Sequence, residues 1–340
     1  MPSFMTHCLF AEDVLKLIEH SWIKEIIKDR LALYYLGAQG PDIFFYYKAK
    51  PWVKYDGIEK LGYLMHDNKT ADFFIRSFDY IKKIRDTKNT NKPCVYSDLL
   101  AYISGYLCHF ALDLTTHPLI HYLAGIDTQK NKKTHKYHNY HKFLESIIDV
   151  YMLSFRKKIQ AHKFKSYELI EDSKNYTKCL GSFYNDLINE VYSIKITPHQ
   201  AATAVYDMIE ILKIFYDPYG IKKVFLGCFE FIMNKKGEIT TAMHPHKVDN
   251  KIDYLNLNHK IWFHPCSKEL KSSKSFTDLY EEALLLAAEF INAGIEYVMD
   301  KETLLNLKNI ITNLSYSTGK ECGTDKDLAY FNSIFEGKSV

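Results

Sequence analysis

Three side chains of the kind that bind metals occur at helical spacing in the segment "YLCHFALDLTTHPLIHY", residues 106–122. His109, Asp113 and His117 are four residues apart, and His121 follows four residues further on. Residues four apart lie one turn above each other on the same face of an α-helix. The residue before a proline avoids the helical conformation, and a proline follows His117. The choice between His117 and His121 as a ligand therefore stays open.

A second pair repeats this spacing in "HKFLESIIDVYML", where Glu145 follows His141 by four residues. Imidazole and carboxylate are the ligands of zinc sites that keep an open position for water. An unpaired carboxylate on an otherwise apolar helix costs several kcal/mol, so each acid needs a cation or strong donors. The two pairs indicate a site for a divalent metal. The alternative is a set of buried histidines and acids that hydrogen-bond to one another.

Helical periodicity dominates the rest of the chain and predicts an all-α fold, a multi-helix bundle. Residues 95–117 and 139–155 are apolar on nearly all sides, which is typical of central helices. Residues 222–242 fit either a helix with a loop or a hairpin that turns at "NKKG". Two amphipathic stripes are formed by Val14, Leu17, Ile18, Trp22 and Ile26, and by Leu279, Ala283, Leu286, Ala287, Phe290 and Ile291, the second after a Ser275/Asp278 cap signal.

Length and composition predict one domain over residues 1–320, followed by a C-terminal tail, 321–340, whose order the sequence leaves open. Hydrophobic residues make up 47% of the 340 residues and charged residues 25%, as in folded globular proteins. The net charge is +3, from 44 basic and 41 acidic residues spread along the chain. We therefore expect no nucleic-acid partner, because nucleic-acid binding requires a concentrated basic surface.

The seven cysteines are odd in number and show no CxxC spacing. This pattern argues against a disulfide framework and favours a reducing compartment. The first residues, "MPSFMTHCLFAEDVLK", lack a basic region followed by a long apolar region, so we expect no secretory signal and a cytoplasmic location, with non-classical export left open. Uncharged stretches fall short of the roughly 20 residues that a membrane-spanning helix needs.

The order of five motifs resembles the bacterial zinc-dependent phospholipase C family, an all-α fold related to the P1-type nucleases. The motifs are an N-terminal His, "GPD" within "YLGAQGPDIFFYY" (35–47), "MH" within "LGYLMHD" (61–67), "HxxxDxxxH" and "HxxxE". The similarity by motif covers roughly residues 5–150. "YLNLNHKIW" and "SFTDLYEEA" nearer the C-terminus are similar more weakly. The resemblance implies a zinc-dependent phosphodiester hydrolase that cleaves a phospholipid or a related phosphodiester and makes peripheral membrane contact.

The resemblance also implies a set of zinc ligands: His7, Asp42, His66, His109, Asp113, His117, His141 and Glu145. Asp42, His66, His109 and Asp113 match the ligands of one ion. Asp113 is expected to bridge to an ion held by His7, and His117, His141 and Glu145 match the remaining one. In the secreted enzymes the mature N-terminal residue completes the site of the His7 counterpart. Because the start of this chain differs, two or three Zn²⁺ ions are expected.

Asp42 is the candidate catalytic residue, because a carboxylate beside zinc can orient or deprotonate the attacking water. Two rival hypotheses remain. An HD-type metal phosphohydrolase would use His66 and Asp67 of "MHD" with Asp113 as a distant acid, but it leaves the pair His141 and Glu145 without a role. A non-catalytic helical binding module would use zinc only as a structural staple, with a closed four-ligand shell.

Overall fold

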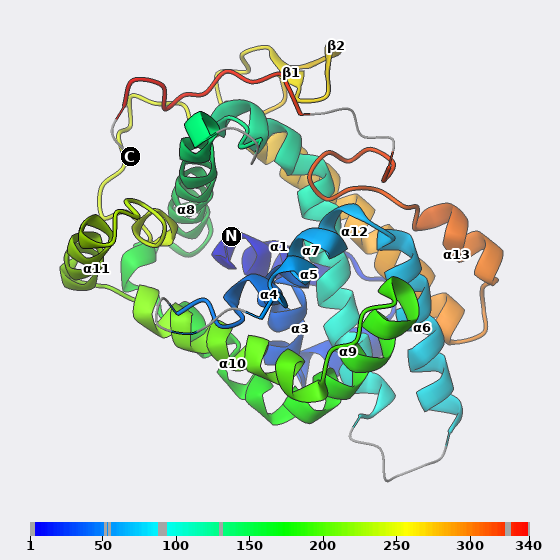
Figure 1. The fold of residues 1–340 in the computed structure, drawn as a ribbon. Coiled ribbons are helices and arrows are strands. Elements are labelled where there is room, and N and C mark those ends of the chain that lie inside the picture. Colours follow the sequence, from blue (N-terminus) through cyan, green and yellow to red (C-terminus); the bar gives the residue numbers. More distant parts are fainter. Residues whose placement is uncertain are drawn as a thin grey trace.

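The computed structural model describes residues 4–50, 53, 56–87, 94–128, 132–323 and 328–338. Within these residues the chain is almost entirely helical (Figure 1), as the periodicity predicted. The α-helices are α1 (Phe4–Leu17), α2 (Ser21–Lys28), α3 (Leu31–Gly37), α4 (Ile43–Tyr46), α5 (Lys60–Asp67), α6 (Thr70–Asp86), α7 (Tyr96–Ala124), α8 (His135–Lys157), α9 (Thr177–Tyr192), α10 (Pro198–Phe215), α11 (Ile221–Ile232), α12 (Phe276–Val298) and α13 (Leu304–Ile310). Short 3-10 helices are η1 (Gly40–Asp42), η2 (Lys132–Thr134), η3 (Ala161–Lys163), η4 (Ser166–Leu169), η5 (Glu171–Tyr176) and η6 (Thr240–Ala242).

One small sheet interrupts the helical pattern in the described residues. Strands β1 (Trp262–His264) and β2 (Ser267–Ser272) pair antiparallel, with Trp262 opposite Ser272. A register shift separates this pairing from that of His264 with Ser267. The hairpin lies at the edge of the helical body, near one end of α7 (Figure 1).

Helix α7 is the centre of the molecule, and α3, α12, α1, α6 and α8 pack around it. Its residues are buried on every side, which explains why the sequence is apolar all round the helix. Helix α3 approaches it unusually closely, because Gly37 and Gly105 each lie against a backbone carbonyl of the other helix. A Cβ at either glycine would overlap that carbonyl. This close approach brings the turn after α3, with Gly40 and Asp42, against α7.

Helix α7 continues through Pro118 to Ala124, so His117 is helical although it precedes a proline. A proline removes one backbone hydrogen bond from the helix interior, a cost that surrounding packing can offset. Here Pro118 and its neighbours are buried. The released carbonyl of Leu114 lies close to Gly319, whose φ of +66° suits glycine. The tertiary packing therefore keeps His117 on the same helical face as Asp113.

The first apolar stripe, predicted as a single helix, divides into α1 and α2 with a break at residues 18–20. The second stripe is the helix α12, and its predicted capping box is present: Ser275 accepts from the Asp278 backbone at 3.2 Å, and the Asp278 side chain accepts from the Ser275 backbone at 2.8 Å. Residues 222–242 form the helix α11 and a loop, so the hairpin alternative was wrong.

Two further features concern the cysteines and the C-terminal residues. Cys94 and Cys179 form a disulfide that joins the start of α7 to α9, although the cysteine pattern argued against disulfides. The C-terminal segment lies against the end of α7, where the backbone N–H groups of Asn332 and Ile334 donate to α7 carbonyls, both at 2.9 Å. Phe335 is buried there. This segment is therefore part of the packed structure.

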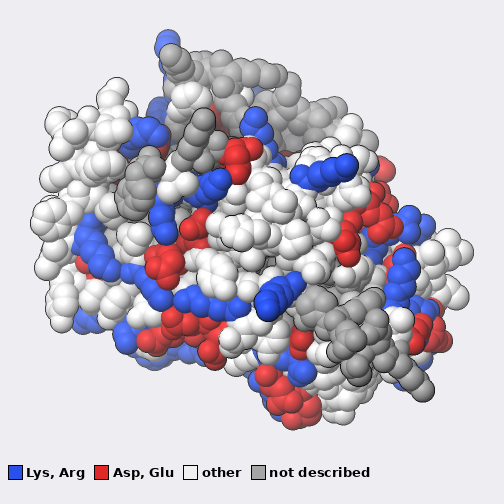
Figure 2. Space-filling view, turned by 60° about the horizontal axis from the view of Figure 1, so that its bottom comes forward, with Lys and Arg blue, Asp and Glu red and all other residues white. Residues whose placement is uncertain are grey.

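Two observations bear on partners. Basic and acidic residues lie side by side over the face shown in Figure 2, in keeping with the net charge of +3. Among the helices that the structure describes, none is long and apolar enough to cross a bilayer.

Candidate metal centre

The central helix α7 presents three ligand-type side chains along one buried face. His109, Asp113 and His117 follow one another at four-residue intervals, as the sequence predicted. The Nε2 atom of His109 lies 3.1 Å from Asp113 Oδ2, and the Nδ1 atom of His117 lies 3.6 Å from the same oxygen. The Asp113 carboxylate thus lies between two imidazoles.

Two more histidines reach this face from the N-terminal part of the chain. The Nε2 atom of His7, on α1, lies 3.4 Å from Asp113 Oδ1, and its ring stacks on that of His109 with centroids 4.3 Å apart. The Nε2 atom of His66, on α5, lies 3.2 Å from Asp42 Oδ1 at the end of η1. Segments far apart in sequence therefore converge on α7.

Helix α8 supplies the other wall of the site. The Nε2 atom of His141 lies 3.0 Å from Glu145 Oε1 one turn along the same helix. The Nε2 atom of His117 lies 3.4 Å from the same Glu145 oxygen. The candidate ligands of α7 and those of α8, which the sequence predicted on separate helices, therefore meet across the α7–α8 interface.

All eight residues proposed as zinc ligands fall into three groups of three, in each of which the ligand atoms lie within 4.8 Å of one another. His109 belongs to two groups, whereas the resemblance assigned it to a single ion together with Asp42 and Asp113. Asp113 has one oxygen toward His7 and the other toward His109 and His117, an arrangement that suits a bridging carboxylate. The groups are His7, His109 and Asp113; Asp42, His66 and His109; and His117, His141 and Glu145.

His117 belongs to these groups, and His121 does not. The His121 ring lies 4.9 Å from the His141 ring, so it borders the site. Burial, together with His141 and His117, holds the pKa of His121 well below its ordinary value, so His121 is neutral near pH 7. The continuous α7 helix thus favours the residue before the proline as the ligand.

Three of the histidines share one arrangement that fixes their tautomer. A backbone carbonyl can only accept a hydrogen bond, so the Nδ1 atom that faces it carries the hydrogen. In a neutral imidazole the Nε2 atom then presents a lone pair, which is how a metal-ligating histidine is normally held. The Nδ1–carbonyl pairs are His66 with Gly62 (2.6 Å), His109 with Ala38 (3.2 Å) and His117 with Tyr316 (3.1 Å).

Buried polar atoms without hydrogen-bond partners mark the same place. They include both carboxylate oxygens of Asp42, one oxygen each of Asp113 and Glu145, the Nε2 atom of His109 and the Nδ1 atom of His7. Buried charged oxygens need a cation or several donors to offset their desolvation. Oxygens and imidazole lone pairs that point at one another repel, so this donor set fits a cation between them and suits zinc.

The charge states of these groups agree with that interpretation. Burial, followed by the neighbouring His109, lowers the pKa of His7 to about 4, so its imidazole is neutral near pH 7. Burial opposes ionisation of Asp113 and Glu145, but the surrounding histidines outweigh it and hold the pKa of both carboxyls below its usual range. Burial also opposes protonation of His117, but Asp113 and Glu145 raise its pKa to about 9, so a metal ion bound at His117 would have to displace the proton from its Nε2 atom. The site therefore holds charged carboxylates that attract cations.

Close packing holds His109 in place. Gly40 has a φ of +52°, and a Cβ there would overlap the His109 ring. Only glycine combines this backbone conformation with so close a contact. Contact with the His109 ring thus explains why the first residue of "GPD" is a glycine.

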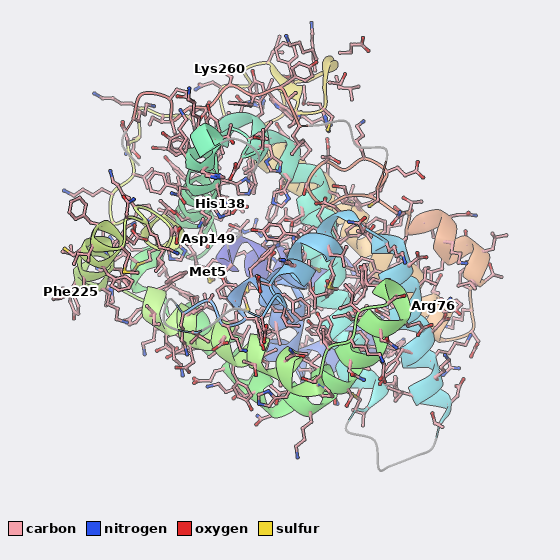
Figure 3. All side chains as sticks on the ribbon, viewed as in Figure 1. Met5, Arg76, His138, Asp149, Phe225 and Lys260 are labelled. Carbon is pink, nitrogen blue, oxygen red and sulfur yellow. A yellow bond between two sulfur atoms is a disulfide. The ribbon has the colours of Figure 1, made fainter. Side chains whose placement is uncertain are left out.

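Asp149 supports the site, and the sequence did not single it out. Its carboxylate accepts from the backbone N–H of Met5 at 3.1 Å, from the backbone N–H of Thr6 at 2.7 Å and from the Thr6 hydroxyl at 2.7 Å. The Nε2 atom of His244 lies 3.0 Å from its other oxygen. Figure 3 shows Asp149 beside the start of α1. Its position four residues after Glu145 was the signal available. Asp149 anchors the helix that carries His7.

Tyr316 was also missed, because no motif or spacing in the sequence singles it out. Its backbone N–H donates to the His66 carbonyl at 2.9 Å, while its carbonyl faces His117 Nδ1. Its ring lies 5.0 Å from the His66 ring and 4.7 Å from the Phe110 ring. The residue therefore links two candidate ligands from opposite sides of the site.

The aromatic run "IFFYY" divides between core and site. Phe44, Tyr46 and Tyr47 are buried, in keeping with core packing. The ring of Phe45 stacks on His66 with centroids 5.6 Å apart, and Tyr63 packs on its edge at 4.7 Å. Of this run, Phe45 is the residue in contact with a candidate ligand.

Asp67, the ligand that the HD-type hypothesis requires, and two further histidines lie outside the three groups. The hydroxyl of Ser315 donates to Asp67 at 2.7 Å, so the aspartate of "MHD" has a protein partner. The Nε2 atoms of His246 and His264 lie at hydrogen-bond distance from the backbone carbonyls of Asp217 (2.9 Å) and Thr318 (3.0 Å). Residues 1–3, on which the expectation about the N-terminal ligand depended, lie outside the described residues.

Comparison with known proteins agrees with this geometry. No curated protein and no solved structure matches the chain. The family described as zinc dependent phospholipase C matches residues 6–194, more than half of the 340 residues and the part that contains every candidate ligand. The chain belongs to the zinc-dependent phospholipase C family.

Proposed function

We propose that this chain is a zinc-dependent phosphodiester hydrolase of the phospholipase C type, which cleaves a phospholipid or a related phosphodiester. The observation that carries the proposal is the number of ligands in each group. Each of the three groups offers three protein ligands, one fewer than a closed tetrahedral zinc site. Three ligands with an open position are typical of catalytic zinc, whereas structural zinc has four. His109 has one free nitrogen, Nε2, which two of the groups share, so the described residues would hold two or three ions.

The chemistry assigns a role to each part of the site. Zinc bound there lowers the pKa of water, neutralises the phosphoryl oxygens and stabilises the leaving alkoxide. Asp42 orients the attacking water and accepts its proton, because both its oxygens are buried and lack hydrogen-bond partners. The water oxygen forms a bond to phosphorus in line with the bond to the leaving alkoxide, which breaks. The backbone carbonyls facing His66, His109 and His117 hold these imidazoles in position.

The two rival functions are less well supported. An HD-type phosphohydrolase needs Asp67 as a ligand, but Asp67 accepts a hydrogen bond from Ser315 and belongs to none of the three groups. A structural zinc module needs closed shells, and the groups of the described residues have three ligands each. The HD-type function also does not account for His141 and Glu145 facing His117.

Metal analysis combined with activity tests the proposal. We expect purified protein to contain two or three zinc ions per chain and to hydrolyse phosphatidylcholine or a soluble aryl phosphodiester. His141→Ala should lose zinc and activity, whereas His199→Ala, an exposed histidine on α10, should keep both. Protein without metal and without activity on either substrate would contradict the proposal.

Asp42→Asn tests the catalytic role more narrowly. Loss of a positioned general base lowers rates by about 10²–10⁴-fold, and we expect a decrease in this range with zinc still bound. An Asp42→Asn variant with zinc-supported activity equal to that of the wild type would show that another group activates the water.

The cellular location remains a prediction. We propose a cytoplasmic location, and the Cys94–Cys179 disulfide provides a test, because disulfides persist in oxidising compartments. Mass spectrometry of alkylated protein from its native cells should find both thiols reduced if the prediction is right. A fully formed disulfide there would favour export.

A further inference from the structure

Helix α11 carries large apolar side chains on the outside of the molecule. Phe225 is 72% exposed, Phe231 80% and Ile232 79%. Glu230 is the only buried residue of the helix. Figure 3 shows Phe225 directed away from the body. Scattered exposed apolar residues are common, but a contiguous apolar surface of this kind marks an interaction site.

The exposed residues form one stripe along the helix. They recur at intervals of three and four, the spacing that places side chains on one helical face. Tyr219 and Met233, next to the two ends of the helix, are also exposed. We call this surface the α11 patch; it consists of Tyr219, Ile221, Val224, Phe225, Cys228, Phe231, Ile232 and Met233.

The charges around the α11 patch are mainly basic. Lys222, Lys235 and Lys236 are exposed at the two ends of the helix, and Lys235 pairs with the exposed Glu238 at 3.2 Å. The acid on the helix, Glu230, is turned inward and accepts from the backbone N–H groups of Gly237 at 3.0 Å and of Thr240 at 2.8 Å. An apolar helical face flanked by lysines fits a membrane surface with anionic lipids. A second copy of the chain would bring the same lysines together.

The α11 patch is attached to the wall of the metal site. The turn after α11 is held on α8 by two hydrogen bonds: Asn139 donates to the Lys236 carbonyl at 3.1 Å, and Lys142 donates to the Glu238 carbonyl at 2.8 Å. Both donors lie within one helical turn of the candidate ligand His141. Figure 1 shows α11 and α8 on the same side of the molecule.

We propose that α11 is a membrane-docking helix whose apolar stripe enters the surface of a bilayer containing anionic phospholipids. Docking holds α8, the helix that carries His141, close to the lipid surface. This proposal deepens the proposed function and rests on it, because phospholipid is the substrate class proposed there. The docking itself requires neither zinc nor hydrolysis, so it can be measured separately.

Vesicle sedimentation tests the apolar contribution. Wild-type protein should sediment with vesicles of phosphatidylcholine and phosphatidylglycerol. The variant Phe225→Ser/Phe231→Ser/Ile232→Ser should bind at least about tenfold more weakly, because it removes three large apolar side chains from the bilayer. The matched control is Leu285→Ser/Leu305→Ser, whose leucines are 69% and 71% exposed on α12 and α13. It should bind as the wild type does.

Two further measurements test the contribution of the lysines and the insertion of α11 into the bilayer. Lys222→Gln/Lys235→Gln/Lys236→Gln should weaken binding to phosphatidylglycerol vesicles about tenfold or more and reduce its salt dependence. Cys228 is an exposed free cysteine on α11, so an environment-sensitive fluorophore can be attached there. Its emission should shift to shorter wavelength when vesicles are added, because the probe enters an apolar medium.

Several results would overturn the inference. The inference is wrong if wild-type protein does not sediment with these vesicles. It is also wrong if the leucine control loses as much vesicle binding as the triple serine variant. A wild-type dimer that the triple serine variant converts to monomer would assign the α11 patch to a second copy. Parallel hydrolysis of a soluble aryl phosphodiester separates the two proposals. Vesicle binding without hydrolysis contradicts the proposed function alone, and hydrolysis without vesicle binding contradicts the docking helix alone.

Discussion

Removal of the Asp149 carboxylate should destabilise the protein through the first turn of α1. The carboxylate accepts from two backbone N–H groups of that turn and from the Thr6 hydroxyl, all in a buried place. These N–H groups have no partner within their own helix. In Asp149→Ala the buried donors lose their acceptor, whereas in Asp149→Asn one amide oxygen can still accept. The two variants should therefore differ in stability.

The expected magnitudes follow from the contacts that are lost. Asp149→Asn removes the negative charge at a helix N-terminus and one acceptor, which costs about 1–2 kcal/mol. Asp149→Ala leaves several buried donors without a partner, at about 1–3 kcal/mol each in full, and partial entry of water limits the sum to about 3–5 kcal/mol. Because α1 carries His7, Asp149→Ala should also lower the zinc content by about one ion per chain.

Urea unfolding followed by circular dichroism measures these differences. We expect lower midpoints in the order wild type, Asp149→Asn, Asp149→Ala, with an unchanged slope. Thr6→Val isolates the hydroxyl contact: it should cost about 1 kcal/mol in the wild type and nothing in Asp149→Ala. If Asp149→Ala unfolded at the wild-type midpoint, the carboxylate would not anchor α1, and the reasoning would be refuted.

Three further predictions concern the site and the helix beside it. Gly40→Ala should displace His109 and abolish zinc binding in two groups, because the new Cβ overlaps the imidazole. The control is Gly337→Ala, which is also at positive φ (+71°) but has no described atom within 4 Å of its Cβ. This variant should retain its full zinc content. Chelation of zinc should lower the free energy of unfolding by roughly 3 kcal/mol for each site at which the free zinc concentration had been a hundred times the Kd. An unchanged unfolding curve would show that zinc binding does not stabilise the fold. Burial lowers the pKa of Lys223 to about 8, so between pH 8 and its ordinary 10.5 the unfolded chain binds more protons than the folded one. The stability of the wild type relative to Lys223→Met should therefore rise by about 1–3 kcal/mol over this window, as measured by urea unfolding at both ends, and a falling difference would show that the burial argument has the wrong sign.

The candidate ligands on α7 and α8 could be proposed from spacing, because an α-helix imposes its period on the side chains. His109, Asp113 and His117 share a face of α7, and His141 and Glu145 share a face of α8. His7, Asp42 and His66 have no such spacing, and only the resemblance to a known family pointed to them.

Pro118 shows where local reasoning fails. The residue before a proline avoids the helical region in an isolated chain, yet α7 continues past it. Packing around a buried helix outweighs a local preference of a few kcal/mol. The decision between His117 and His121 depended on this packing and on the facing helix α8.

The chain by itself determined its helical class, its two ligand-bearing helices and the cap of α12, because periodicity and capping are local. Only the tertiary structure decided which acid faces which imidazole, that Asp149 anchors α1, and that Tyr316 joins His66 to His117. Contacts between residues distant in sequence leave no periodic trace in the sequence. The three groups exist because packing around α7 brings five separate segments to one buried place.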